Sequence, residues 1–437
     1  MRKLTVKNFS VIKEAELEFG KITVLIGPQS SGKSLLCKLA YFLGKEFIDI
    51  AVGSVFAGRS LHEFRKEISE IFADRFPIEI SDDPGSFLCF EADDFRIERQ
   101  RLGEDDALGE EFWWSPKFET TFSALSNLEA ESTTNGSDFS SDRREQVRAR
   151  FNLLLSARQE VNPFVHRTLY IPNGRSFFVN TSQGFRALDN PDIDPLTREF
   201  GSLIAWGRAW NPDPALAVQT RQNLEAIRRS ILIIAGGDIE GRDSYAEFVR
   251  FSDKRRVPFT LLSSGTQEIL PLFNVIERMI TEQRRRVIFP RNGSVTKDLL
   301  ITSKGWIYVE EPEANVFPKT QYQLVQLFSW LSSEPDLHFS WVVTTHSPYV
   351  LSSFNNLLEA WQVGHVDGER CKAVRNVIDE KYWVNPEEFR AYSIEDGHLK
   401  SIMDEETHLI SDNYLDAVSE QIGGEFDELL RIGYVEA

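Results

Sequence analysis

Residues 27–34 read Gly27-Pro28-Gln29-Ser30-Ser31-Gly32-Lys33-Ser34 and fit the pattern G-x-x-x-x-G-K-[ST] at every fixed position. They follow a short apolar run, Ile22–Ile26, which suits a strand buried on both faces. After Lys33, Leu and Ala residues fall on one helical stripe. Glycines allow the backbone to direct its N–H groups at phosphates, and the start of a helix adds positive potential. The sequence therefore predicts a strand, a phosphate-binding loop and a helix in succession.

Hydrophobic periodicity predicts further elements around this loop. Ala15, Leu17 and Phe19 alternate with glutamates, which is the pattern of a half-buried strand. The other predicted elements are a helix over 61–76, a hairpin over 87–98 that turns near Asp93 and Asp94, a loop over 131–142, a helix over 143–161, and mostly helical structure over 184–235 with a break at 211–214.

The second half of the chain shows more strand patterns than the middle. The predicted elements are strands 245–251 and 257–262 joined by a polar turn at 252–255, a β-α-β unit of strand 306–309, helix 321–331 and strand 339–344, a hairpin of strands 389–394 and 399–403, and a last helix over 414–432.

These elements predict an α/β fold with a mixed central sheet flanked by helices. We expect four parts along the chain. They are an N-terminal lobe with the phosphate-binding loop at 1–125, a mostly helical insertion with a flexible loop at 126–240, a C-terminal lobe at 241–355, and a hairpin-and-helix extension at 356–437.

The composition limits the classes of partner. The net charge of −18 argues against a surface built for nucleic acid, although basic stretches at 143–150 and 284–286 leave local contacts open. The three cysteines lie far apart, which predicts neither a disulfide framework nor a zinc site. No apolar run has membrane-spanning length, and the first residues lack the pattern of a signal peptide, so we expect a cytoplasmic protein without a membrane partner.

Carboxylates follow a second apolar strand at 306–313, which reads WIYVEEPE. A carboxylate at a strand tip beside the phosphate loop can hold the shell of a Mg²⁺ ion, and we assign Glu310 to this position together with the hydroxyl of Ser34. Glu311 would lie where a carboxylate can accept a proton from an attacking water molecule. Lys33 would reach the β- and γ-phosphates of a nucleotide.

Two further motifs lie in the C-terminal lobe. Ser264 and Gly265 precede an apolar helix and would make a second anion site at its N-terminus. Because one γ-phosphate needs a single cradle from its own subunit, this second cradle suggests that each subunit completes the site of its neighbour. His346, in the stretch TTHSP, follows the strand after the carboxylates, where it can contact the γ-phosphate and orient the attacking water.

In their order along the chain, the phosphate loop, LSSGTQE, VEEPE and TTHSP resemble the ABC-type ATPases of the SMC/RecF branch. They are most similar to the OLD-like AAA ATPases of prokaryotic defence and DNA-repair systems. The opening KLTVKNFSVIKEAELEFGKITVLIGPQSSGKS and the stretch YIPNGRSFF at 170–178 are also similar to that branch. The likeness covers residues 1–45 and 245–355 well and the middle loosely.

The resemblance implies a P-loop ATPase with an ABC-type head, which forms a homodimer or a larger even-numbered oligomer closed over Mg-ATP. It implies Glu311 as the catalytic carboxylate and His346 as a switch residue, both acting with Lys33. The implied ATP contacts are Gly27, Ser30, Ser31, Gly32, Lys33 and Ser34 of one subunit and Ser264 and Gly265 of the other, and the implied metal ligands are Ser34 and Glu310.

The chain departs from that pattern in three ways. Position 310 is Glu where many ABC proteins have Asp, and the signature reads SSGTQ and not SGGQ. No glutamine can be assigned to the Q-loop from the sequence. Gln100 is a candidate by position, and Arg175 is a second residue that could contact nucleotide or partner.

OLD nucleases carry a metal-dependent nuclease domain after the ATPase. The sequence after His346 shows no separated Glu and Asp-x-Asp groups of the kind that two-metal chemistry requires. We therefore expect an ATPase that senses or gates for a separate effector protein, with a nuclease in anti-phage defence as the leading hypothesis. The alternative is a RecF- or SMC-like DNA-binding ATPase that uses residues 140–240 as an arm. A transporter motor is disfavoured because Lys33 and Gly265 lie far apart in the chain.

Overall fold

The structure is a computed structural model in which part of the chain is described. The described residues are 2–77, 82–92, 95–101, 110–133, 147–148, 151, 167–180, 193–208, 218–240, 248–282, 286–287, 290–291, 294–295, 299–300, 305–335, 337, 339–411, 423–429 and 431. Most of the predicted helices over 143–161 and 414–432, most of the predicted loop over 131–142 and the predicted break at 211–214 lie outside them.

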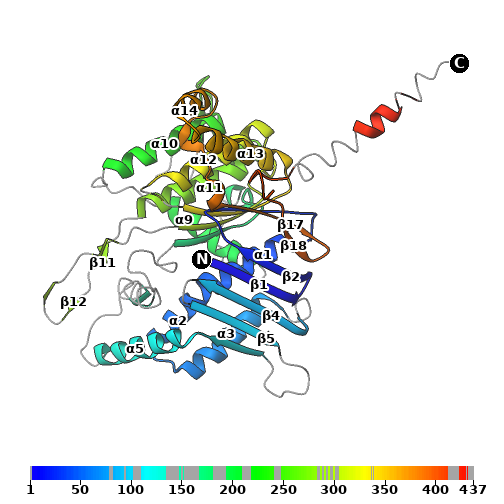
Figure 1. Ribbon diagram of the computed structural model, residues 1–437. Coiled ribbons are helices and arrows are strands. Elements are labelled where there is room, and N and C mark those ends of the chain that lie inside the picture. The colour runs from blue at the N-terminus through cyan, green and yellow to red at the C-terminus, as the bar shows by residue number, and fades with distance from the viewer. Residues whose placement is uncertain are drawn as a thin grey trace.

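A single mixed sheet runs through the described part of the chain (Figure 1). Its strands follow the order β6-β5-β4-β1-β2-β18-β17-β3-β16-β15-β7. The strands are β1 (Arg2–Phe9), β2 (Ile12–Glu18), β3 (Ile22–Ile26), β4 (Asp82–Ala92), β5 (Phe95–Arg101), β6 (Glu110–Trp114), β7 (Arg167–Ile171), β15 (Gly305–Glu310), β16 (Phe339–Thr345), β17 (Phe389–Glu395) and β18 (His398–Ser401).

The sheet has a parallel half and an antiparallel half. β17, β3, β16, β15 and β7 are parallel, whereas β6, β5, β4, β1 and β2 pair antiparallel. The registers Thr344↔Leu25 and Glu310↔Thr344 align the strands. Carboxyl ends of parallel strands meet at one edge of a sheet. The loops that follow β3, β15 and β16 are therefore neighbours.

Two hydrophobic clusters cover the two faces of the sheet. Successive side chains of a strand point to opposite faces. On β16, Trp341 and Val343 join one cluster and Val342 joins the other, and on β3 the same alternation separates Val24 from Leu25. The parallel strands are apolar on both faces because each face is covered by helices.

The helices are divided between these clusters. The helices of the N-terminal lobe pack with the cluster that contains Val342. The helices from the middle of the chain onward pack mainly with the cluster that contains Trp341, which forms the upper part of Figure 1. The helices are α1 (Lys33–Tyr41), a π-helical turn (Phe42–Glu46), α2 (Phe47–Phe56), α3 (Leu61–Arg75), α5 (Pro116–Thr133), α7 (Phe177–Asn180), α9 (Pro195–Arg208), α10 (Val218–Ala235), α11 (Ser264–Glu282), α12 (Pro318–Ser333), α13 (Pro348–Gly364) and α14 (Gly368–Arg375), with 3₁₀ turns at Phe259–Leu261, Glu380–Tyr382 and Pro386–Glu388.

Small sheets complete the described structure. They comprise β8 (Gly237–Glu240), β9 (Phe248–Phe251) and β10 (Arg256–Pro258), and the short pairs β11 (Arg286–Val287) with β14 (Leu299–Leu300) and β12 (Pro290–Arg291) with β13 (Ser294–Val295). The predicted strand over 257–262 is wrong in its second half. There Pro258 precedes a 3₁₀ turn, Phe259–Leu261, that leads into α11.

The predicted α/β class is confirmed: the sheet is mixed and helices flank it. The predicted strands around residues 15, 24, 307 and 342 and the helix over 61–76 are also confirmed. The four predicted parts of the chain stay a prediction, but the hairpin β17–β18 lies inside the main sheet, between β2 and β3. β17 is buried along almost all its length, which explains this central place.

Two expectations from composition can also be compared with the structure. Cys37, Cys89 and Cys371 are free thiols, as the sequence predicts. Among the helices of the described residues, none is long and apolar enough to cross a membrane.

Candidate functional site

The loop 27–32 joins β3 to α1 with a backbone that only a few residues adopt readily. Gly27, Ser30 and Gly32 have φ of 155°, 60° and 103°. A Cβ on Gly27 would lie 2.7 Å from the carbonyl oxygen of Ile394, and one on Gly32 would lie 2.4 Å from Ile12 Cδ1. No side chain caps the N-terminus of α1, which leaves its first N–H groups directed at the loop.

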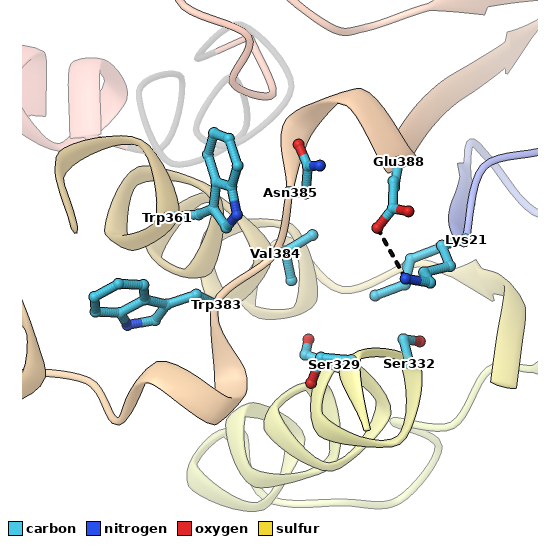
Figure 2. Close-up of a pocket in the computed structure, with 10 residues that line it drawn as sticks. Lys21, Ser329, Ser332, Trp361, Trp383, Val384, Asn385 and Glu388 are labelled. Atoms are coloured by element: carbon cyan, nitrogen blue, oxygen red, sulfur yellow. Dashed lines mark hydrogen bonds and ion pairs between the residues drawn. The ribbon is translucent and has the colours of Figure 1, made fainter. Parts of the chain in front are cut away.

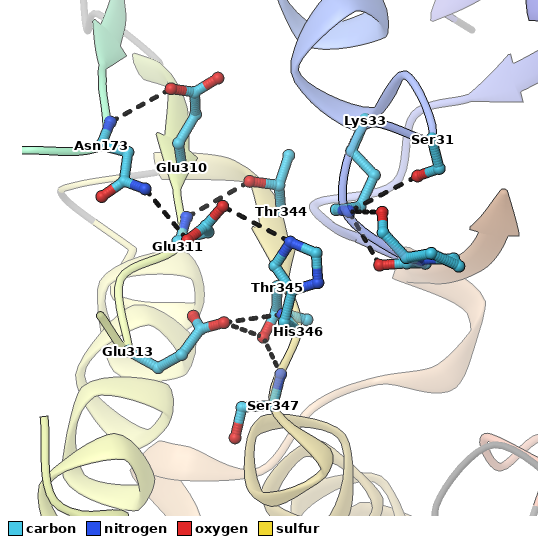
Figure 3. Close-up of polar contacts among 12 residues, drawn as sticks. Ser31, Lys33, Asn173, Glu310, Glu311, Glu313, Thr344, Thr345, His346 and Ser347 are labelled. Carbon is cyan, nitrogen blue, oxygen red and sulfur yellow. Dashed lines mark hydrogen bonds and ion pairs between the residues drawn. The ribbon is translucent and has the colours of Figure 1, made fainter. Parts of the chain in front are cut away.

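Lys33 lies against this loop. Its Nζ donates hydrogen bonds to the carbonyl oxygens of Gly27 and Pro28, both at 2.8 Å, and the side chain is 5% exposed. Burial lowers the pKa of Lys33, and the carboxylates that follow β15 oppose this effect (Figure 3). The ammonium group therefore sits in the concave side of the loop and faces acidic groups across it.

Glu310 is the last residue of β15, and Glu311 follows it. Glu310 is 8% exposed, and its Oε1 and Oε2 accept hydrogen bonds from the Tyr170 hydroxyl at 2.6 Å and the Asn173 N–H at 3.1 Å. Glu311 has a φ of 40°, which is uncommon outside glycine. Its Oε2 accepts from Asn173 Nδ2 at 3.0 Å, and its N–H donates to the Thr344 carbonyl at 2.9 Å. β7 and the loop after it therefore hold both carboxylates, and β16 holds the backbone of Glu311.

His346 approaches Glu311 from the end of β16. Its Nε2 lies 3.5 Å from Glu311 Oε1. Glu313 fixes the backbone there, because its Oε1 accepts from Thr345 Oγ1 at 2.6 Å and from the His346 N–H at 2.8 Å. Figure 3 shows Lys33, Glu311 and His346 on facing sides of one space.

Ser34 and Glu310 fit the donor set of a Mg²⁺ ion bound with a nucleotide. Such an ion takes one or two protein oxygens and fills its shell with phosphate and water oxygens. Ser34 is exposed on the first turn of α1. Burial and then the charge of Glu310 raise the pKa of the Cys37 thiol on the same helix. Burial also raises the pKa of Tyr170, which therefore remains a hydrogen-bond donor to Glu310.

The N-terminus of α11 carries Ser264 and Gly265. Ser264 is exposed, whereas Gly265 is buried. Gln267 Nε2 donates to the carbonyls of the preceding turn and holds it against the helix. A Cβ on Gly265 would lie 2.4 Å from the carbonyl oxygen of Asn315. A large residue at Gly265 would therefore disturb the subunit's own loop, and only Ser264 offers a clean test of contacts with another subunit.

Two further sequence predictions are corrected by the structure. Arg175, named as a residue that could contact nucleotide or partner, is 1% exposed and donates to carbonyl groups of its own subunit. Gln100 is exposed on β5, six positions from β3 in the strand order β5-β4-β1-β2-β18-β17-β3, and does not lie beside the phosphate loop.

Two residues that bind the carboxylates carry no sequence signal that points to them. Tyr170 and Asn173 were not assigned any role, although they bind Glu310 and Glu311 directly. The stretch at 170–178 was noticed only as a likeness. Hydrogen bonds between segments about 140 residues apart leave no local periodicity that could have revealed them.

A hollow of about 220 Å³ lies at the opposite end of β3 (Figure 2). Trp361, Trp383 and the buried Ser332 line it beside an ion pair of Lys21 and Glu388 at 3.0 Å. Lys21 precedes β3 and the phosphate loop follows it. A five-residue strand spans about 17 Å, so the hollow is separate from the site around Lys33.

The mixed sheet, the loop 27–34 and the helix α1 define a P-loop nucleotide-binding protein. Residues 22–352 match the family described as "AAA domain, putative AbiEii toxin, Type IV TA system". Because the match spans well over half of the sequence, the chain belongs to this AAA family.

Solved structures of other proteins resemble this fold at low sequence identity. An SMC head domain from Thermotoga maritima is 13% identical with a TM-score of 0.38, covering 92% of this chain and 97% of that one. An SMC head domain with an extended coiled coil, bound to the C-terminal domain of ScpA from Pyrococcus furiosus, is 13% identical with a TM-score of 0.36, covering 97% and 100%. A dimeric bacterial ABC transporter cassette is 12% identical with a TM-score of 0.32, covering 91% and 96%. No curated protein matches the sequence.

Proposed function

We propose that the chain binds Mg-ATP and hydrolyses it as an ABC-type ATPase. The observation that carries this proposal is the meeting of Lys33, Glu311 and His346 at the carboxyl ends of three adjacent parallel strands, with Glu311 and His346 3.5 Å apart. The backbone of Gly27, Ser30, Ser31 and Gly32 would hold the phosphates, and Lys33 would exchange its carbonyl partners for phosphate oxygens.

The acidic and basic groups of the site would then have different roles in hydrolysis. Glu311 would take the proton of the attacking water, and Asn173 fixes the carboxylate for this transfer. His346 would orient the same water or contact the γ-phosphate. Ser34 and Glu310 would hold Mg²⁺, which when bound neutralises charge on the phosphates. Positioning and electrostatic stabilisation provide most of the catalysis in phosphoryl transfer.

The site is proposed to be completed by a second copy of the chain. Ser264 is exposed at the N-terminus of α11, where helix N–H groups favour an anion. Its contact with a γ-phosphate bound to another subunit would make closure depend on ATP. The protein would then be a dimer or a larger even-numbered oligomer.

We propose further that this ATPase acts as a sensor or gate for a separate effector, a nuclease in prokaryotic anti-phage defence. The description of the matched family names a toxin–antitoxin system, in which one component acts with another, and this supports a role beside a separate effector. The net charge of −18 favours a basic protein partner. The alternative is a RecF- or SMC-like ATPase that binds DNA in repair.

The first prediction tests ATP binding and metal dependence. We expect the purified protein to release phosphate from ATP only with Mg²⁺, and EDTA to abolish release. Lys33→Ala should weaken binding of a fluorescent ATP analogue by at least about 100-fold because the charge at the phosphates is lost. Lys38→Ala is the matched control, since Lys38 lies on the same helix and pairs with Asp194. Equal binding by both variants would contradict the proposed site.

The second prediction separates the two candidate functions. Fluorescence anisotropy of a labelled DNA duplex should show weak binding at physiological salt, with and without Mg-ATP. A protein that neutralises many phosphates loses affinity steeply as salt rises. Tight binding with a steep dependence between about 50 and 200 mM salt would favour the DNA-binding alternative.

A further inference from the structure

Arg175 is a buried cation that the proposed chemistry does not use. It follows β7 and is 1% exposed. Its Nη1 donates to the carbonyl oxygens of Glu310 at 2.7 Å and Pro172 at 3.0 Å, and its Nη2 donates to that of Glu311 at 3.0 Å. The guanidinium group therefore holds the backbone of both carboxylate residues.

The third nitrogen of Arg175 binds a different element. Its Nε donates to the carbonyl oxygen of Glu268 on α11 at 3.1 Å and lies 3.5 Å from the carboxylate Oε2 of the same residue. Glu268 is 2% exposed, and its Oε1 accepts from the Ser176 N–H at 3.3 Å and hydroxyl at 2.6 Å. The loop after β7 and the first turn of α11 are therefore joined through two buried charges.

This loop also reaches the side chains of the carboxylates. Asn173 donates its N–H to Glu310 and its Nδ2 to Glu311. The first turn of α11 also touches the segment after β15 directly, where Gly265 packs against the carbonyl of Asn315. Three segments, 172–176, 264–268 and 310–315, thus form one packed unit, and Arg175 is the side chain that bonds to all three.

Burial and charge explain why an arginine suits this position. Burial lowers the pKa of Arg175, and the nearby carboxylates, Glu268 first, oppose that effect. Arginine stays charged under such conditions and presents donors in several directions at fixed angles. A lysine has one ammonium group on a flexible stem and cannot bridge carbonyls that lie on three segments.

We propose that Arg175 is a positioning residue that couples the N-terminus of α11 to the carboxylates Glu310 and Glu311. A displacement of α11, as when Ser264 engages a second subunit, reaches the carboxylates through the Arg175–Glu268 pair. The site then becomes catalytic only when α11 is in its engaged position. This role of Arg175 rests on the proposed ATPase function.

The kinetic test compares Arg175→Lys with a matched variant elsewhere. We expect Arg175→Lys to lower kcat for ATP by about 10- to 100-fold, because small displacements of a reacting group have effects of that size, with KM changed by less than about 3-fold. Arg99→Lys is the control. Arg99 lies on β5, far from the site, is as buried as Arg175, and its guanidinium group stacks over the ring of Phe72. Equal kcat losses in both variants would overturn the proposal.

A double-variant cycle isolates the pair. Glu268→Gln should lower kcat by a smaller factor than Arg175→Lys, because the bond from Arg175 to the backbone carbonyl of Glu268 remains. Arg175→Lys with Glu268→Gln should be no worse than Arg175→Lys alone within about 2-fold, because the link to Glu268 is already broken. Losses that multiply would show independent roles and contradict coupling.

Hydrogen exchange of the nucleotide-free protein tests the coupling without any turnover. Arg175→Lys should speed exchange in 264–268 and 310–315 as well as in 172–176, and Arg99→Lys should leave all three unchanged. Faster exchange in 172–176 alone would overturn the coupling. If the wild type binds no ATP, the proposed ATPase function has failed, and the exchange pattern still decides whether Arg175 couples these segments.

Discussion

Replacement of Glu311 by glutamine should lower ATP turnover by about 100- to 10,000-fold, the range that a positioned proton acceptor contributes. Glutamine has nearly the same shape, and its carbonyl can still accept the hydrogen bond from Asn173. It cannot accept the proton of the attacking water. The loop around Lys33 is untouched, so the affinity for ATP should change by less than about 3-fold.

Glu311→Gln should also trap the closed assembly, since ATP stays bound while both phosphate cradles remain. The measurement is the mass in solution of wild type and variant, with and without Mg-ATP. Glu359→Gln is the control, because Glu359 is an exposed glutamate on α13. Normal turnover in Glu311→Gln would remove Glu311 from the mechanism, and a monomer under every condition would remove the role of Ser264 in a second subunit.

The sequence predicted the part of the fold whose signals are local. The apolar run Ile22–Ile26 predicts β3 with the ends that the structure has, and the pattern after Lys33 predicts α1. The hairpin β17–β18 was also predicted, but its place beside β3 was not, because pairing of residues 22 and 389 depends on the whole chain. The helix α5 was missed although Phe118, Phe122 and Leu125 have helical spacing.

The same division holds for the candidate site. Motifs that lie along one segment, such as the loop 27–34, could be recognised directly. The left-handed backbone of Glu311 and the burial of Arg175 could not, since each arises from contacts between distant segments. A short sequence stretch does not distinguish a side chain that contacts nucleotide from a buried one that supports the site, and the burial of Arg175 identifies it as the second kind.

A Ser264→Arg variant is expected to bind ATP normally and to lose nearly all turnover, with a fall of about 100-fold or more, as for removal of a group that stabilises transition-state charge. The exposed side chain of Ser264 leaves room for arginine within its own subunit, whereas any side chain on Gly265 would meet Asn315. Ser202→Arg is the control, because Ser202 is an exposed serine on α9, a helix to which no role in the site is assigned. A Ser264→Arg protein with wild-type turnover would show that each subunit works alone.

Co-expression of Ser264→Arg with Lys33→Ala then decides whether the site is shared. In a mixed dimer, the intact loop of the Ser264→Arg subunit faces the intact α11 N-terminus of the Lys33→Ala subunit, and the other site carries both defects. Mixed dimers purified through two different tags should therefore recover about half of the wild-type turnover, because one of two symmetric sites is complete. If Ser264 acted on ATP bound to its own subunit, each subunit would carry one defect in its own site and mixing could restore nothing. Recovery from two inactive proteins thus requires that ATP be held between subunits.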